Sequence, residues 1–233
     1  MPSASLTARQ ESQIRELYTR SIQRGAASFR RAFDDTDEFC LGMTPSGALG
    51  AVVGLSYIRQ QVDGREHIII LSGTVALDKA YRGRGINNLI GLRAWARCRM
   101  ASPGAALFWG FTSSTVGAYL FMQRSCAEHW PRHDAPTPAP IKHLMDCMGA
   151  QIGGYDRRAG LVMYNTRPLE ALDGPSAARH PDPAVRFYAG RNPQSAAGGA
   201  LLCLCPLTTA NAVSITRHML SRYLRRNRTR RDS

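Results

Sequence analysis

The stretch VALDKAYRGRGI, residues 75–86, contains the local signal on which the fold of this chain can be argued. An apolar run ends at Leu77, and two Arg-Gly pairs then lead into a segment with helical periodicity. The first N–H groups of a helix have no partner within the helix, and the helix dipole places partial positive charge there. Glycine lets the backbone approach an anion without a Cβ in the way. The stretch therefore predicts a phosphate site, with the amides of Arg82, Gly83, Arg84, Gly85 and Ile86 facing the anion.

Two well-known phosphate motifs do not fit this turn. The chain has no G-x-G-x-x-G fingerprint of a dinucleotide fold and no G-x-x-x-x-G-K-[ST] loop. Arg82 and Arg84 add charge beside the glycines. The pattern favours a diphosphate held by a short strand-to-helix turn of another kind.

The surrounding pattern predicts alternating strands and helices. Ile14, Leu17, Tyr18 and Ile22 recur at helical spacing, whereas the segment EHIIILSGTVALD is rich in β-branched residues. The Ser-Gly pair inside that strand, Ser72 and Gly73, indicates a bulge or a close approach of another backbone or ligand. The expected helices span residues 7–24, 86–100, 114–125 and 141–149, and the expected strands span 38–43, 48–59, 66–78, 105–111 and 160–166.

The last third of the chain has a different composition. Residues 168–183 contain four prolines among small polar residues, which is typical of a linker or a long surface loop. We expect two strands next, VRFYAGR (185–191) and GALLCLCPL (199–207), and then an amphipathic helix over 208–226. The predicted organisation is a main domain at 5–166, a C-terminal extension at 184–226 that packs on it, and a basic disordered tail at 227–233.

The charge of the chain is strongly positive. It has 30 Lys and Arg against 17 Asp and Glu, a formal net charge of +13, and only two of the cations are lysines. The last 17 residues are crowded with arginines: Arg217, Arg222, Arg225, Arg226, Arg228, Arg230 and Arg231. Such a surface attracts polyanions, among them nucleotide phosphates, an acidic carrier protein and nucleic acid.

Other sequence features exclude several classes of protein. No apolar run approaches the roughly 20 residues of a membrane-spanning helix, and the N-terminus lacks a secretory pattern, so we expect a cytoplasmic protein with no membrane span. The six cysteines are scattered, with no paired C-x-x-C spacing. His129, His133 and Asp134 lie in HWPRHD, but Pro131 prevents a helical pair of ligands, so no metal is expected.

The stretch x-Tyr-Arg-Gly-x-Gly-Ile between a strand and a helix resembles the acyl-CoA-binding motif of the GNAT superfamily of N-acyltransferases. The resemblance is specific over about residues 71–100 and covers 5–166 in the order of elements. It implies an α/β (α+β) fold: a mixed, mostly antiparallel twisted sheet flanked by helices. Here that sheet is followed by a C-terminal extension of two strands and a helix.

The resemblance also implies a donor site. The preceding strand splays from its neighbour, and the backbone of Val75, Ala76 and Leu77 faces pantetheine. The loop amides from Arg82 to Ile86 hold the pyrophosphate, and Asn87 lies just beyond. The family often has Gln or Arg where this chain has Ala80, three positions before the first glycine.

The family transfers the acyl group by direct attack, and a tyrosine on the helix after the next strand commonly protonates the leaving thiolate. In one register Thr112 takes the place of a usual Asn, and Tyr119 is then the acid. In the other register Ser114 takes that place, and Phe121, which cannot donate a proton, falls on the acid. Tyr119 is thus the candidate catalytic residue. The base is left open, with a water held by Ser72 or Thr74 as one possibility.

The expected function is transfer of an acetyl or longer acyl group from acetyl-CoA or another acyl-CoA to a small-molecule or peptide amine. One alternative is an N-acyltransferase that takes its acyl group from an acidic acyl-carrier protein. An alternative of another class is an Arg-rich nucleic-acid-associated protein built on the same scaffold. The acceptor amine is not defined by the sequence, because fold analogy gives the reaction class alone.

Overall fold

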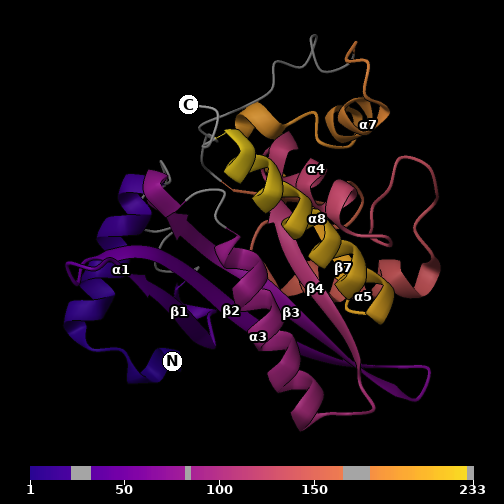
Figure 1. Cartoon of the computed structure of the whole chain (residues 1–233). Coiled ribbons are helices and arrows are strands. Elements are labelled where there is room, and N and C mark those ends of the chain that lie inside the picture. Colours follow the sequence, from indigo (N-terminus) through magenta and orange to yellow (C-terminus); the bar gives the residue numbers. More distant parts are fainter. Residues whose placement is uncertain (22–32, 82–84, 165–178, 230–233) are drawn as a thin grey trace.

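A computed structural model of the chain describes residues 1–21, 33–81, 85–164 and 179–229, with the backbone alone for residues 87–88, 222–223 and 225–229. Its centre is a seven-stranded sheet of order β1-β2-β3-β4-β7-β6-β5 (Figure 1). Neighbouring strands are antiparallel except β3 and β4, which are parallel. The strands are β1 Glu38–Met43, β2 Leu49–Val62, β3 Arg65–Leu77, β4 Ala106–Ser113, β5 Tyr155–Asp156, β6 Leu161–Met163 and β7 Gly199–Pro206.

Helices flank this sheet, so the predicted mixed, mostly antiparallel fold is confirmed. The α-helices of the described residues are α1 Ala8–Ser21, α3 Ile86–Ala101, α4 Val116–Ser125, α5 Ala139–Gln151, α7 Pro183–Arg191 and α8 Thr209–Thr229. Short 3-10 turns occur at Ser3–Ser5, Lys79–Tyr81 and Ser195–Ala197. Among the described residues, no helix combines the length and the apolar character that crossing a bilayer requires.

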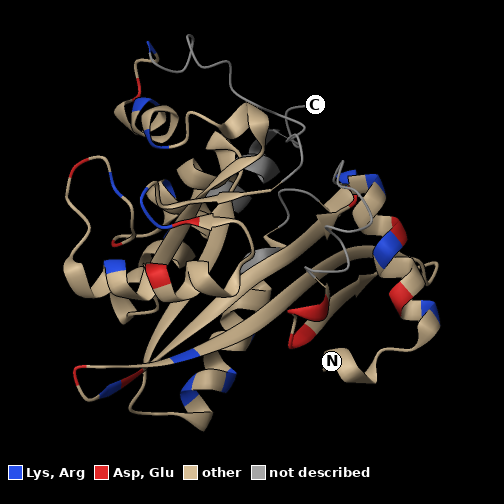
Figure 2. Ribbon diagram, turned by 180° about the vertical axis from the view of Figure 1, so that it is seen from behind, with Lys and Arg blue, Asp and Glu red and all other residues tan. Residues whose placement is uncertain are grey.

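The sheet is covered on both faces, which explains the continuous apolar run in β3. Ile68 and Ile70 pack with Ala94 of α3, whereas Ile69 packs with α5 on the other face, and all three isoleucines are fully buried. Alternate strand residues point to opposite faces, so a strand that is covered on both faces has apolar residues at consecutive positions. α1 packs on the α5 side of the sheet, and the charged surface of α1 faces solvent in the view from behind (Figure 2).

The predicted bulge is present in β3. Val53 pairs with Val75 but Leu55 pairs with Ser72, so Gly73 and Thr74 together stand opposite the single residue Gly54. An extra residue in one strand increases the local twist and bends the strand. The bulge lies where β3 starts to separate from β4.

The C-terminal segment corrects one prediction. Residues 185–191 are not a strand but part of α7, whose first turn begins at Pro183 and whose N-cap Asp182 accepts a hydrogen bond from the Ala184 N–H at 2.9 Å. Proline at the first helical position and an acidic N-cap favour a helix start, and Ala184, Val185 and Tyr188 form its buried side. The apolar spacing of VRFYAGR therefore belongs to a helix.

The other predicted strand, β7, lies inside the sheet between β4 and β6. Every residue from Gly199 to Pro206 is buried. α8 begins three residues later and extends to Thr229, so residues 227–229, predicted to be disordered, are helical. Residues 230–233 and most of the predicted linker lie outside the described residues.

A polar cluster fixes α3 against the sheet. Arg97 of α3 donates to the Glu38 carboxylate at 2.5 Å and also to the Tyr57 hydroxyl, and that hydroxyl donates to Glu38 at 2.7 Å. Burial alone would raise the pKa of Glu38, but the hydrogen bonds from Arg97 and Tyr57 outweigh it and lower that pKa. The cluster holds α3 in place, and thereby its N-terminus.

Candidate active site

The two parallel strands at the centre of the sheet, β3 and β4, stop pairing at one defined point. β3 and β4 pair in register from His67 with Ala106 to Ser72 with Phe111. Beyond Ser72, β3 continues to Leu77 in pairing with β2. The predicted splay is therefore visible in the register of the strands.

The backbone of β3 beyond this point has a definite orientation. The Asp78 N–H donates to the Gly50 carbonyl at 2.9 Å, so the peptide groups at position 78 face β2. Peptide groups alternate in direction along a strand, so those of Ala76 face β2 and those of Val75 face the side from which β4 has diverged. Val75 can thus offer an amide and a carbonyl to an extended ligand there. Leu77 follows at the end of the strand.

Eight residues, from Asp78 to Gly85, connect β3 to α3. Tyr81 N–H donates to the Asp78 carbonyl at 2.8 Å, and Arg20 of α1 binds the Asp78 carboxylate at 3.0 Å. These contacts hold the start of the connection against β2 and α1. Arg82, Gly83 and Arg84, the centre of the predicted phosphate loop, lie outside the described residues.

The far end of the connection is the N-terminus of α3. Gly85 is the N-cap, with φ of 77° in the left-handed region that glycine adopts without strain. Ile86 begins the helix, Asn87 follows in its first turn, and that turn has no acidic side chain. A 16-residue helix therefore presents its free N–H groups and the positive end of its dipole beside the splayed strand.

Tyr119, the predicted acid, lies in the core between α4, α7 and β7. Its side chain is fully buried, its ring lies 5.6 Å from that of Tyr188, and its hydroxyl donates to the Pro131 carbonyl at 3.3 Å. Burial raises the pKa of this phenol above its usual value. Trp130, which precedes Pro131, bonds to Leu204 of β7. The Tyr119 proton is thus engaged by the loop that pairs with β7.

A second tyrosine, which the sequence did not single out, contacts β4 next to the last residue that pairs with β3. The Tyr164 hydroxyl is 2.9 Å from the Thr112 hydroxyl. Thr112 immediately follows Phe111, the last residue of β4 that pairs with β3. Tyr164 is the residue that follows β6. From the sequence alone it is one residue of the strand predicted over 160–166. Its place depends on β7 entering the sheet, which no local spacing reveals.

The side chains considered as the general base lie in two groups, one near the splay and one at the start of β3. Ser72 and Thr74 are 7% and 1% exposed; Ser72 directly precedes the bulge and Thr74 is part of it. Glu66 pairs with Arg59 at 2.6 Å, and the His67 ring packs on Phe108. At about 3.3 Å per residue, His67 lies roughly 26 Å along the strand from Val75, too far to act at the splay.

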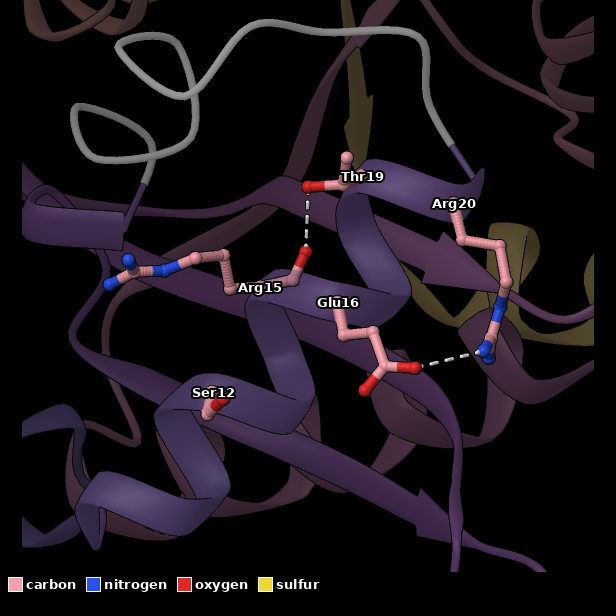
Figure 3. A pocket seen from close by; sticks show the side chains of 5 residues that line it. All are labelled: Ser12, Arg15, Glu16, Thr19 and Arg20. Atoms are coloured by element: carbon pink, nitrogen blue, oxygen red, sulfur yellow. Dashed lines mark hydrogen bonds and ion pairs between the residues drawn. The ribbon is translucent and has the colours of Figure 1, made fainter.

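A hollow of about 520 Å³ lies on the exposed side of α1 (Figure 3). It is lined by Ser12, Arg15, Glu16, Thr19 and Arg20, all from a single helix. Arg20 also binds Asp78, so the hollow adjoins the β3–α3 connection without containing the splay.

The histidines of HWPRHD lie in the connection between α4 and α5. His129 is 4% exposed, and burial followed by the charge of Arg132 lowers its pKa to about 4. Arg132 is engaged with Asp134, through bonds of 2.7 and 2.6 Å. Within the part of the chain that the structure describes, no three His, Cys, Asp or Glu side chains gather as metal ligands would.

No protein-family model and no curated protein matches the chain. Several solved structures are similar to it. An IAA acetyltransferase from Bacillus cereus ATCC 14579 is 10% identical with a TM-score of 0.43, covering 89% of this chain and 96% of its own. A GCN5-related N-acetyltransferase from Kribbella flavida is 18% identical with a TM-score of 0.38, over 53% of this chain. A probable N-acyltransferase from Enterococcus faecalis V583 is 15% identical with a TM-score of 0.39, over 52%.

The alignments with the Kribbella and Enterococcus chains span 33% and 30% of those chains. These likenesses concern the arrangement of strands and helices. The activity of this chain has to be derived from its own site.

Proposed function

We propose that the protein is a GNAT-type N-acyltransferase that moves an acetyl group, or a longer acyl group, from acyl-CoA to a primary amine. The observation that carries the proposal is the parting of β3 from β4 after Ser72 and Phe111, beside the Gly85-led N-terminus of α3. The extended pantetheine arm of CoA needs backbone partners in a split sheet, and the diphosphate of CoA needs a cluster of N–H donors. This fold supplies the two next to each other.

The donor site follows from that arrangement. Val75, Ala76 and Leu77 form the strand along which pantetheine lies, and the Val75 peptide groups face it. Gly85, Ile86 and Asn87 open the helix that receives the diphosphate. Arg82, Gly83 and Arg84 complete the loop in the proposal. Acyl-CoA supplies an activated thioester carbonyl at the far end of this arm.

The reaction needs no covalent enzyme intermediate. The neutral amine attacks the thioester carbonyl, the C–N bond forms, and the C–S bond breaks. The nitrogen loses a proton to water, and the departing thiolate gains one. Ser72 or Thr74 would hold the water that accepts the amine proton, since Ser72 directly precedes the bulge at the splay and Thr74 is part of it.

The proton for the thiolate has two candidate donors. Tyr119 is the residue predicted from the sequence, and its hydroxyl is bonded to Pro131 within the core. Tyr164 lies at Thr112, one residue beyond the last β3–β4 pair. The geometry favours Tyr164, with Thr112 as the hydroxyl through which it is reprotonated. The acid role of Tyr119 stays a prediction that the paired variants in the Discussion test.

Calorimetric titration of CoA into the full chain, with release of free thiol from acetyl-CoA in a panel of amines, tests the proposal. A ligand bound only by the folded state stabilises it by about 2.7 kcal/mol at 100 times its Kd, so CoA raises the Tm. Thiol release that depends on an amine confirms transfer. If CoA gives no heat of binding and does not change the Tm, the proposal is wrong. Turnover with an acyl-carrier protein but not with acyl-CoA would reassign the donor.

A further inference from the structure

The C-terminal helix α8 reaches the site proposed for the donor. The Cε atom of Met219 lies 3.4 Å from the position that a Cβ on Gly85 would occupy. Gly85 is the N-cap of α3, the residue that opens the proposed diphosphate site. In Figure 1, α8 runs across the same side of the sheet as α3 and α4. One side chain of α8 therefore borders the helix end at which the phosphates would bind.

The position of α8 is set by contacts that do not involve Met219. Asn211, fully buried in its first turn, donates to the Pro206 carbonyl at 2.6 Å and to the Glu128 carbonyl at 2.8 Å, and it accepts from the Glu128 N–H at 2.9 Å. Further along, the His218 ring lies edge-on to Phe121 of α4, with centroids 6.0 Å apart. These two anchors fix the direction in which α8 approaches α3.

The charge of α8 suits an anionic neighbour. Residues 209–229 contain no Asp or Glu and five arginines: Arg217, Arg222, Arg225, Arg226 and Arg228. Four of the five follow Met219, and Arg217 precedes it by two positions and is exposed. The sequence of α8 is therefore strongly cationic, and Met219 is the member of the helix that contacts the α3 N-terminus.

We propose that α8 forms the outer wall of the donor site and borders the phosphate groups of an acyl-CoA donor. This inference rests on the proposed function and assigns a role to the C-terminal segment, which the GNAT layout leaves unexplained. Met219 limits the space at Gly85. The wall contacts the diphosphate region and not the acyl group.

The test is a matched pair of carboxylates on neighbouring positions of α8. Met219→Glu places a negative charge beside Gly85, whereas Leu220→Glu places one at an adjacent position that is 56% exposed. Calorimetry on the full chain is expected to show a CoA Kd raised at least about tenfold by Met219→Glu and changed less than about twofold by Leu220→Glu. Met219→Gln, of nearly the same size but neutral, is expected to change the CoA Kd less than about threefold.

A second probe separates phosphate binding from a general effect on the fold. Pantetheine lacks the diphosphate and the nucleotide, so Met219→Glu is expected to leave its affinity unchanged. Equal CoA affinities for Met219→Glu and Leu220→Glu would overturn the role of α8 while leaving the acyltransferase proposal intact. Wild-type protein that does not bind CoA would remove the proposed function itself. A penalty from Met219→Glu that appears with an oligonucleotide and not with CoA would also overturn the inference.

Discussion

The hydroxyl groups of Thr112 and Tyr164 lie 2.9 Å apart although 52 residues separate them in the chain. Thr112 marks the point at which β4 leaves β3, and Tyr164 reaches that point from the residue after β6. The pair therefore places an ionisable hydroxyl at the split in the sheet, where the thioester of the proposed donor would lie.

Tyr164→Phe is expected to lower kcat about 100-fold, because a positioned general acid contributes a factor of this order, while the CoA Kd stays unchanged. Tyr119→Phe removes only a 3.3 Å hydrogen bond to Pro131 and is expected to lower kcat less than about fivefold. Steady-state kinetics with acetyl-CoA and an active amine decides between them. The reverse order of effects would return the acid role to Tyr119.

Gly85→Ala is expected to weaken CoA binding at least about tenfold. Its φ of 77° disfavours alanine by about 1–2 kcal/mol, and the new Cβ would stand 3.4 Å from Met219, at the proposed diphosphate site. Gly47→Ala is the matched control, because Gly47 has φ of 79° with nothing within 4 Å of an added Cβ. Both variants should lose similar stability in urea, and only Gly85→Ala should lose affinity in calorimetry. Equal affinities would argue against a donor site at Gly85.

Asn211→Ala is expected to destabilise the protein by about 2–3 kcal/mol, since it leaves the buried Pro206 carbonyl, and the Glu128 backbone N–H and carbonyl, without their amide partner. Asn192→Ala provides a comparison, because that amide is also buried and bonds to the Gly199 carbonyl at 2.8 Å without touching α8. Hydrogen exchange should increase along α8 in the first variant alone. Unchanged exchange in α8 would show that Asn211 does not anchor it.

Stability is expected to fall as the pH is lowered from about 6.5 to about 4, because of His129. Burial holds its pKa near 4 in the folded protein, against 6.5 for an ordinary histidine, so only the unfolded chain takes up a proton in that range. The folded state thus loses up to about 3 kcal/mol relative to the unfolded state, and the loss is complete below pH 4. Urea titrations of His129→Leu should show a correspondingly shallower decline. His143→Gln, which changes an exposed histidine, should follow the wild type; identical curves for all three proteins would disprove the assignment.

Local chemistry made much of the fold predictable. The β-branched run of β3, the Ser-Gly bulge and the helical spacing of α1 are each read from residues near one another in the chain. The glycines of VALDKAYRGRGI similarly predicted a helix start after a strand, and α3 begins at the predicted residue Ile86. The segment VRFYAGR was mistaken for a strand because its apolar spacing is short, and Pro183 with Asp182 carried the stronger signal of a helix start.

The sequence by itself determined that a strand is followed by a helix beginning at Ile86, and much of the order of elements around that turn, because turns, caps and periodicity act over a few residues. Only the tertiary structure decided that β7 enters the sheet between β4 and β6, that Tyr164 meets Thr112, and that Met219 reaches Gly85. These contacts join residues between 36 and 134 positions apart, and they depend on which strand pairs with which. Strand pairing is set by the burial of whole faces, so no short stretch of the chain could specify it.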